Sequence, residues 1–169
     1  MNLSCEVSFV LLDVVEHMIH DYENDLRENT PTTSSSGAAL TVTLMDKIMD
    51  LFLTLLRKNQ SDLFFQHLYT SLSSFVSKFS KQFFVANTTY VAELCLEAVR
   101  HANSRCPLTR TYSTAFLYLL MKRNYEEAKK NFSRVKVQIT IAISKLVGKR
   151  LKVIRFSISI INLARAHFI

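Results

Sequence analysis

The chain has 169 residues, of which 49% are hydrophobic and 21% charged, a composition typical of a globular protein and unlike that of a disordered tail. It contains only two glycines and two prolines, which argues against Rossmann, P-loop and hydrolase folds, because these need glycines at sharp turns and phosphate loops. The net charge of +7 is uneven, with nine acidic and four basic residues in 1–60 (−5) and twelve basic against two acidic in 122–169 (+10).

Residues 1–28 are predicted to form an amphipathic helix. Apolar residues recur there at helical spacing over five turns, with charged and imidazole side chains largely on the other side. The apolar positions are Val7, Val10, Leu11, Val14, Val15, Met18, Ile19, Tyr22 and Leu26. Residues 29–41, which include the low-complexity run NTPTTSSSGAAL, are predicted to be a Ser/Thr-rich linker.

Capping signals mark the next two helices. Thr43, with Asp46 three residues on, resembles a capping box, and Ser61 offers N-cap chemistry to a third helix. The predicted inward residues of the second helix are Leu44, Ile48, Leu51, Phe52, Leu55 and Leu56. Those of the third are Phe64, Leu68, Leu72, Phe75, Val76 and Phe79.

Two further helices follow at short intervals. One restarts at Asn87 to Thr89, with Val91, Leu94, Cys95, Ala98 and Val99 inward. The other begins at Pro107, a residue tolerated in a first turn, with Tyr112, Ala115, Phe116, Leu119 and Leu120 inward. Short connections force antiparallel neighbours, so we predict an all-α fold of stacked antiparallel helical hairpins, similar to armadillo or HEAT repeats.

The segment RVKVQITIAISK satisfies two templates. Val135, Val137, Ile139, Ile141 and Ile143 alternate as in a strand, and their β-branched character favours one. A helical stripe also fits, through Phe132, Val135, Ile139, Ala142, Ile143 and Leu146. Periodicity alone leaves the fold of 132–169 open, and Gly148-Lys149 would serve as a hairpin turn.

The sequence predicts a cytoplasmic protein. The N-terminal stretch lacks a basic region and is interrupted by Glu6, Asp13 and Glu16, so it does not match a secretory signal. The charge-free run from Phe156 to Ala164 is too short to cross a bilayer. Three cysteines, an odd number, suit a reducing compartment.

Histidines and carboxylates on the first helix are a candidate metal site. Asp13, His17 and Asp21 lie at i, i+4 and i+8, with His20 nearby, a spacing that can hold a divalent ion. Because no fourth ligand can be named, we interpret them as a solvated face.

Cys95, His101 and Cys106 are too irregularly spaced for zinc, which usually shows paired close ligands, and Cys95 is better interpreted as a core residue. No serine lies in a nucleophile-elbow motif, and no paired carboxylates lie in a motif that would separate their pKa values. We therefore predict that the chain is not an enzyme and has no catalytic residue, cofactor or metal.

A basic set in the last third is the candidate interaction surface: Lys122, Arg123, Lys129, Lys130, Arg134 and Lys136. Such residues, with Tyr125 and Phe132 between them, can contact anionic lipid or RNA. The chain lacks a nucleic-acid motif and a long basic amphipathic helix, so a solvated loop also explains them and no nucleic-acid partner is expected. The alternative function is a stand-alone helical module that binds anionic lipid or RNA.

Three long blocks resemble the dedicator-of-cytokinesis (DOCK) family of guanine-nucleotide exchange factors, nearest its zizimin and zizimin-related branches. They are VSKFSKQFF (Val76 to Phe84), AELCLEAVRHANSRCPLTRTYSTAFLYLLMKRNYE (Ala92 to Glu126) and NFSRVKVQITIAISKLVG (Asn131 to Gly148). Long blocks in order are more specific than any short motif. Ser80 stands where the family has proline, and residues 149–169, a basic C-terminal helix or fragment end, match poorly.

The resemblance implies that 42–148 belongs to the helical-repeat region ahead of the catalytic DHR-2 domain, and that Phe132 to Val147 is helical. Family members activate Rac- and Cdc-type Rho GTPases through DHR-2, and no stretch here matches its nucleotide-site loop. The implied function is a scaffold segment in small-GTPase signalling, in the cytoplasm and peripherally at the plasma membrane. Its implied partners are other domains of the parent exchange factor and, indirectly through them, the Rho-family GTPase. An incomplete helical array exposes its end faces, so we also expect self-association.

Overall fold

The computed structural model describes residues 3–28, 43–86, 89–127 and 133–147; the predicted linker 29–41 and the C-terminal segment 149–169 lie outside them. All elements in the described part are helical, which confirms the all-α fold class. They are α1 (Leu3–Asp21), α2 (Glu23–Glu28), α3 (Leu44–Arg57), α4 (Asp62–Lys78), the π-helical turn η1 (Gln82–Ala86), α5 (Thr89–Ala102), α6 (Pro107–Glu127) and α7 (Ser133–Val147).

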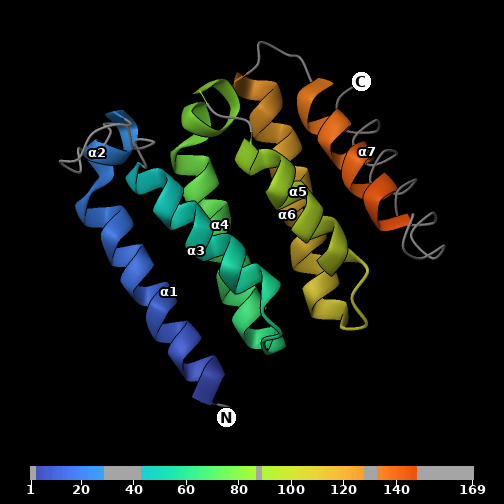
Figure 1. Cartoon of the computed structure of the whole chain (residues 1–169), viewed down its shortest axis with the longest axis horizontal. Helices are drawn as coiled ribbons and strands as arrows, with labels where there is room; N and C mark the ends of the chain where they lie inside the picture. Colours follow the sequence, from blue (N-terminus) through green and yellow to red (C-terminus); the bar gives the residue numbers. More distant parts are fainter. Residues whose placement is uncertain (1–2, 29–42, 87–88, 128–132, 148–169) are drawn as a thin grey trace, which may run out of the picture.

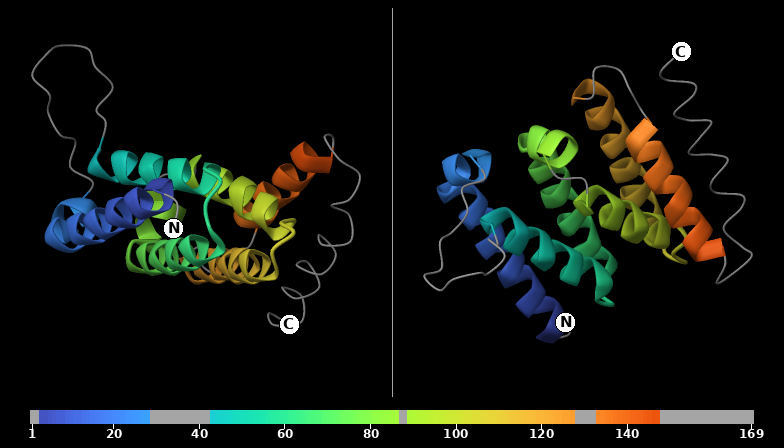
Figure 2. Two further views of the ribbon diagram at one scale, coloured as in Figure 1. Left: turned by 90° about the horizontal axis from the view of Figure 1, so that it is seen from below. Right: turned by 45° about the horizontal axis from the view of Figure 1, so that its top comes forward.

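The helices form a stack of antiparallel hairpins (Figure 1). Helices α3 and α4 make one hairpin and α5 and α6 the next, and each helix also packs on its counterpart in the neighbouring hairpin. The view from below in Figure 2 shows α3, α5 and α7 in one layer above α4 and α6. Helix α1 packs on α4 at one edge and α7 packs on α5 at the other. The predicted helical-repeat architecture is confirmed.

The predicted caps start the helices where expected. The Thr43 hydroxyl accepts a hydrogen bond from the Asp46 backbone (3.2 Å), while the Thr43 backbone donates to the Asp46 carboxylate (2.7 Å), completing the capping box. Ser61 accepts from the Phe64 backbone at the start of α4, and Pro107 is the first residue of α6. Each cap contributes about 1 kcal/mol to helix stability.

Aromatic rings form the centre of the core. The ring of Phe75 on α4 lies 5.5 Å from that of Phe52 on α3, 5.0 Å from Phe79 and 5.7 Å from Phe83, measured between centroids. All four side chains are fully buried, and burying each contributes roughly 1.5–3 kcal/mol before entropy costs. Every predicted inward residue of α4 and α5 is buried, whereas Ala115 on α6 is exposed, contrary to prediction.

Helix α1 differs most from its prediction. Its buried positions are Cys5, Ser8, Leu12, Val15 and Ile19, which face α4. Four residues assigned to the apolar stripe are exposed instead: Val7, Val10, Leu11 and Val14. The helix is apolar on two sides and has one long neighbour, so periodicity could not determine which side is covered. Tyr22, also predicted inward, is exposed at the break between α1 and α2.

Polar contacts fix α1 and α2 against the following hairpin at both ends. At the start of α1, Cys5 Sγ donates to Ser61 Oγ (3.0 Å) and Gln60 Nε2 donates to Ser8 Oγ (2.8 Å). At α2, Lys78 Nζ lies 2.6 Å from Glu23 Oε2, and Gln82 Nε2 donates to the Arg27 carbonyl (2.9 Å). The first helix is therefore an integral layer of the stack.

Helix α7 resolves the ambiguity between strand and helix. Val135, Ile139 and Ala142 are buried, as the helical pattern requires, while Val137 and Ile141 are exposed. The main packing partner is α5, with α6 also in contact, and this packing covers one helical face and so overrides the β-branched preference. The implied helix is confirmed over 133–147; Phe132 and Gly148-Lys149 lie outside the described residues.

Candidate functional site: a polar junction between the hairpins

A buried carboxylate joins the two central hairpins. Glu97 on α5 is only 2% exposed, and its oxygens accept from Arg57 Nε on α3 (3.1 Å) and from Arg100 Nη1 one turn along α5 (2.6 Å). Arg57 is the last residue of α3 and also pairs with Glu93, one turn before Glu97. These four residues, Arg57, Glu93, Glu97 and Arg100, form an ionic junction that links α3 to α5 within their shared layer.

The charges of this junction compensate one another. The hydrogen bond that Arg57 donates to Glu97 raises the pKa of the Arg57 guanidinium; burial opposes this effect and Glu93 reinforces it. Both arginines remain half-exposed, so water solvates the outer edges of their guanidinium groups. Glu97 thus accepts two charge-assisted hydrogen bonds, and the one from Arg57 fixes the register of α3 against α5.

A second polar contact ties α4 to the end of α5. The Tyr69 hydroxyl lies 2.7 Å from His101 Nδ1, and the imidazole also hydrogen-bonds the backbone of Leu56. Burial lowers the pKa of His101, while burial and the nearby Glu97 raise the pKa of Tyr69. A neutral imidazole has one donor and one acceptor nitrogen, which matches these two partners.

The junction is suited to holding helices and not to chemistry on a substrate. Tyr69 is 1% exposed and packs on the ring of Phe116 (5.6 Å), so a substrate cannot reach its hydroxyl. The His101 ring packs 4.6 Å from that of Phe65. A general acid or base must lie within hydrogen-bond reach of a bound reactant, and the buried hydroxyl of Tyr69 does not.

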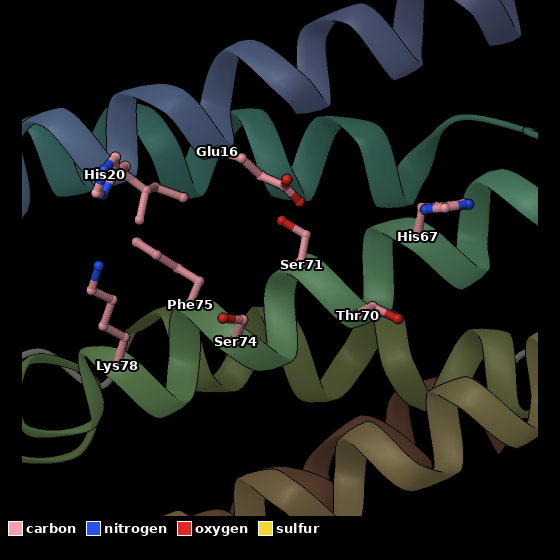
Figure 3. A pocket seen from close by; sticks show the side chains of 9 residues that line it. Glu16, His20, His67, Thr70, Ser71, Ser74, Phe75 and Lys78 are labelled. Atoms are coloured by element: carbon pink, nitrogen blue, oxygen red, sulfur yellow. The ribbon is translucent and has the colours of Figure 1, made fainter.

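An open groove of about 390 Å³ lies between α1 and α4. Figure 3 shows Glu16 and Ser71 facing one another across it, with His20 and Lys78 toward one end and His67 toward the other. Lys78 is already paired with Glu23. Within the part of the chain that the structure describes, no three potential metal-ligating side chains gather, here or elsewhere.

The candidate metal residues of α1 do not form a ligand set. Asp13, His17 and Asp21 are exposed on α1, and His20 lies apart from them at the groove. Cys95 is fully buried, and burial raises the pKa of its thiol to about 12, which confirms its interpretation as a core residue.

The predicted basic surface is described only in part. Lys122 on α6 and Lys136 on α7 are exposed, and the end of α6 and the start of α7 lie at the same end of the stack (Figure 1). Arg123 pairs with Glu126 (2.8 Å). Lys129, Lys130 and the side chain of Arg134 lie outside the described residues. The binding role of this surface stays a prediction.

Sequence reasoning did not identify the ionic junction. Its only local signal is Glu97 itself, a charged residue that stands in the sequence directly between the apolar Leu96 and Ala98. The partner Arg57 is 40 residues away, on another helix. Such a pairing depends on how hairpins stack and cannot be seen in a single helix.

None of the described helices combines the length and apolar character that crossing a bilayer requires.

No protein-family model and no solved structure matches the chain, but individual proteins do. It is 34% identical over 148 residues to dedicator of cytokinesis protein 11 of Danio rerio, covering 87% of this chain and 7% of the relative. It is 32% identical over 147 residues to dedicator of cytokinesis protein 7 of Homo sapiens (87% and 6%).

Human dedicator of cytokinesis protein 9 is 30% identical over 166 residues, covering 95% of this chain. The chain spans 8% of that relative's length, so the alignment concerns a small stretch of a much larger protein. Several relatives of one family thus match nearly the whole chain, in agreement with the three sequence blocks. The chain belongs to the dedicator-of-cytokinesis family, as a helical segment that spans 6–8% of the length of these three relatives.

Proposed function

We propose that this chain is a rigid, non-catalytic spacer of a DOCK-type guanine-nucleotide exchange factor for Rho-family GTPases. It would hold other domains of the exchange factor at a fixed distance and orientation in the cytoplasm, peripherally at the plasma membrane. Family membership supports the signalling context. The buried junction around Glu97 supports the mechanical role, because it locks α3, α4 and α5 together with ionic and tyrosine–histidine contacts.

Rigidity is the property that a spacer needs. Helices held only by apolar contacts can slide, whereas charge-assisted hydrogen bonds have defined lengths and directions. Glu97, at 2% exposure, accepts from Arg57 only in the observed register of α3 against α5, so a slip of one turn would leave this buried carboxylate with Arg100 as its remaining partner. We infer that the junction fixes the angle between consecutive hairpins.

A chimera tests the spacer role. In dedicator of cytokinesis protein 11 of Danio rerio, the matching 148 residues are replaced either by this chain or by a flexible Gly/Ser linker of equal residue count. We expect this chain to preserve GTPase activation in cells and the linker to reduce it. Equal activity of both chimeras would contradict a spacer that depends on rigidity.

A nucleotide-release assay tests the absence of an exchange centre. Purified chain is added to Rac- and Cdc-type GTPases loaded with fluorescent GDP, with an isolated DHR-2 domain as positive control. We expect release at the intrinsic rate of each GTPase. Acceleration that rises with the concentration of this chain would overturn the non-catalytic assignment.

A further inference from the structure

The outer side of α1 carries an apolar stripe that no described helix covers. Val7, Val10 and Val14 recur three and four residues apart, with Leu3 one turn earlier and Leu11 beside them. Each of these large side chains is exposed, and Val10 is 62% exposed. Figure 1 shows α1 at one end of the stack, with its outer side turned away from α4. Contiguous exposed apolar residues of this kind mark interaction surfaces.

The stripe lies in an acidic part of the chain. Residues 3–28 contain seven acidic residues and one basic residue, a net charge of −6. Glu6, Asp13 and Asp21 on α1 are exposed. Charge complementarity therefore selects a partner that is both apolar and basic, and it disfavours pairing of α1 with another α1.

The opposite end of the stack has these properties. On α7, Val137 and Ile141 are one turn apart and exposed, Ile141 by 40%. Lys136 and Lys145 on the same helix are exposed, and α7 contains no acidic residue. Figure 1 places α7 at the far end from α1, so the two surfaces of one chain cannot reach each other.

We propose that α1 is a docking surface for α7 of a second copy of this chain, so that copies join head to tail. The order of helices supports this geometry, because α7 lies in the layer of α3 and α5 whereas α1 packs on α4. Helix α7 of one copy and α1 of the next would thus pair as α3 and α4 do. A head-to-tail contact leaves one free surface at each end and adds further copies. This docking does not depend on a role in an exchange factor.

Two substitutions each block one surface. Val10→Glu places a carboxylate in the stripe of α1, and Ile141→Glu does so on α7. Both positions are exposed, so the variants should retain wild-type helix content by circular dichroism, and each should weaken association about tenfold or more. Leu63→Glu is the matched control, because it makes the same change at an exposed position of α4, outside both surfaces.

Molar mass is measured by light scattering and sedimentation for the full chain over a wide range of concentration. We expect the wild type and Leu63→Glu to grow beyond a dimer as concentration rises, and each blocked variant alone to remain one chain. An equal mixture of Val10→Glu and Ile141→Glu should form dimers and stop there, because only one pair of intact surfaces remains.

Other outcomes would overturn the proposal. A wild-type chain that stays monomeric throughout would show that α1 and α7 of different copies do not pair. Dimers of Ile141→Glu alone would indicate α1–α1 pairing, and dimers of Val10→Glu alone would indicate α7–α7 pairing. Association that survives both substitutions would place the contact elsewhere.

Discussion

Replacing Glu97 by glutamine tests whether the ionic junction holds the hairpins together. The change preserves the shape of the side chain and removes its charge. Glu97 accepts two charge-assisted hydrogen bonds, at 3.1 Å from Arg57 and 2.6 Å from Arg100. Each such bond contributes about 1.5–3 kcal/mol, against about 1 kcal/mol for a neutral one. Because both arginines are half-exposed, we expect a loss near the lower limit, about 1–2 kcal/mol in the free energy of unfolding.

Glu93→Gln is the matched control. Glu93 lies on the same helix, one turn earlier, and pairs with the same Arg57, but its side chain is 44% exposed. A surface pair of this kind contributes about 0–1 kcal/mol, and that contribution disappears in high salt. We therefore expect Glu93→Gln to lower the free energy of unfolding by less than Glu97→Gln does.

The assay is urea unfolding followed by circular dichroism at neutral pH, in low and high salt. The slope of free energy against urea should be the same in all variants, so that shifts of the midpoint report stability. The reasoning is refuted if the two glutamine variants are equally stable, or if Glu97→Gln is more stable than the wild type.

Three further predictions concern the core and the titratable groups. Phe75→Ala should lower the free energy of unfolding by about 3–5 kcal/mol in the same urea assay. Leu63→Ala, at an exposed site on the same helix, should lower it by less than about 0.5 kcal/mol. Equal losses would contradict the assigned core. Burial lowers the pKa of His101, so below a pH of about 6.5 the unfolded chain binds a proton that the folded chain does not. The free energy of unfolding therefore decreases as the pH is lowered, by at most about 1.4 kcal/mol per pH unit. His101→Gln should remove that part of the slope in unfolding curves between pH 5 and 7. Cys95 should resist alkylation in the native chain while the half-buried Cys106 reacts, as peptide mass spectrometry would show; modification of Cys95 without unfolding would contradict its burial.

Local chemistry made the central hairpins predictable. The capping box at Thr43, the cap at Ser61 and Pro107 at the start of α6 each act within one helical turn, so the sequence contains the whole signal. The apolar stripe of α4 was also predicted correctly, because α4 packs on α1, α3 and α6 and these neighbours bury every residue of the stripe.

Features set by the stack were harder to predict. Both sides of α1 are apolar, and only the position of α4 determines that Leu12 is covered and Val10 is not. The contact between Arg57 and Glu97 joins residues 40 apart and depends on the register of two hairpins. In α7 the period-2 and helical patterns overlap on Val135, Ile139 and Ile143, and packing on α5 selects the helix.

Amide hydrogen exchange of the native chain tests most directly whether stacked hairpins bury their apolar faces on one another. Exchange is slowest where opening a helix exposes core on both sides. Helix α4 packs on α1, α3 and α6, and α5 packs on α3, α6 and α7. We predict that the slowest amides lie in α4 and α5 and that those of α1 and α7 exchange faster. Uniformly fast exchange, or slowest exchange in α1 or α7, would contradict the stacked arrangement.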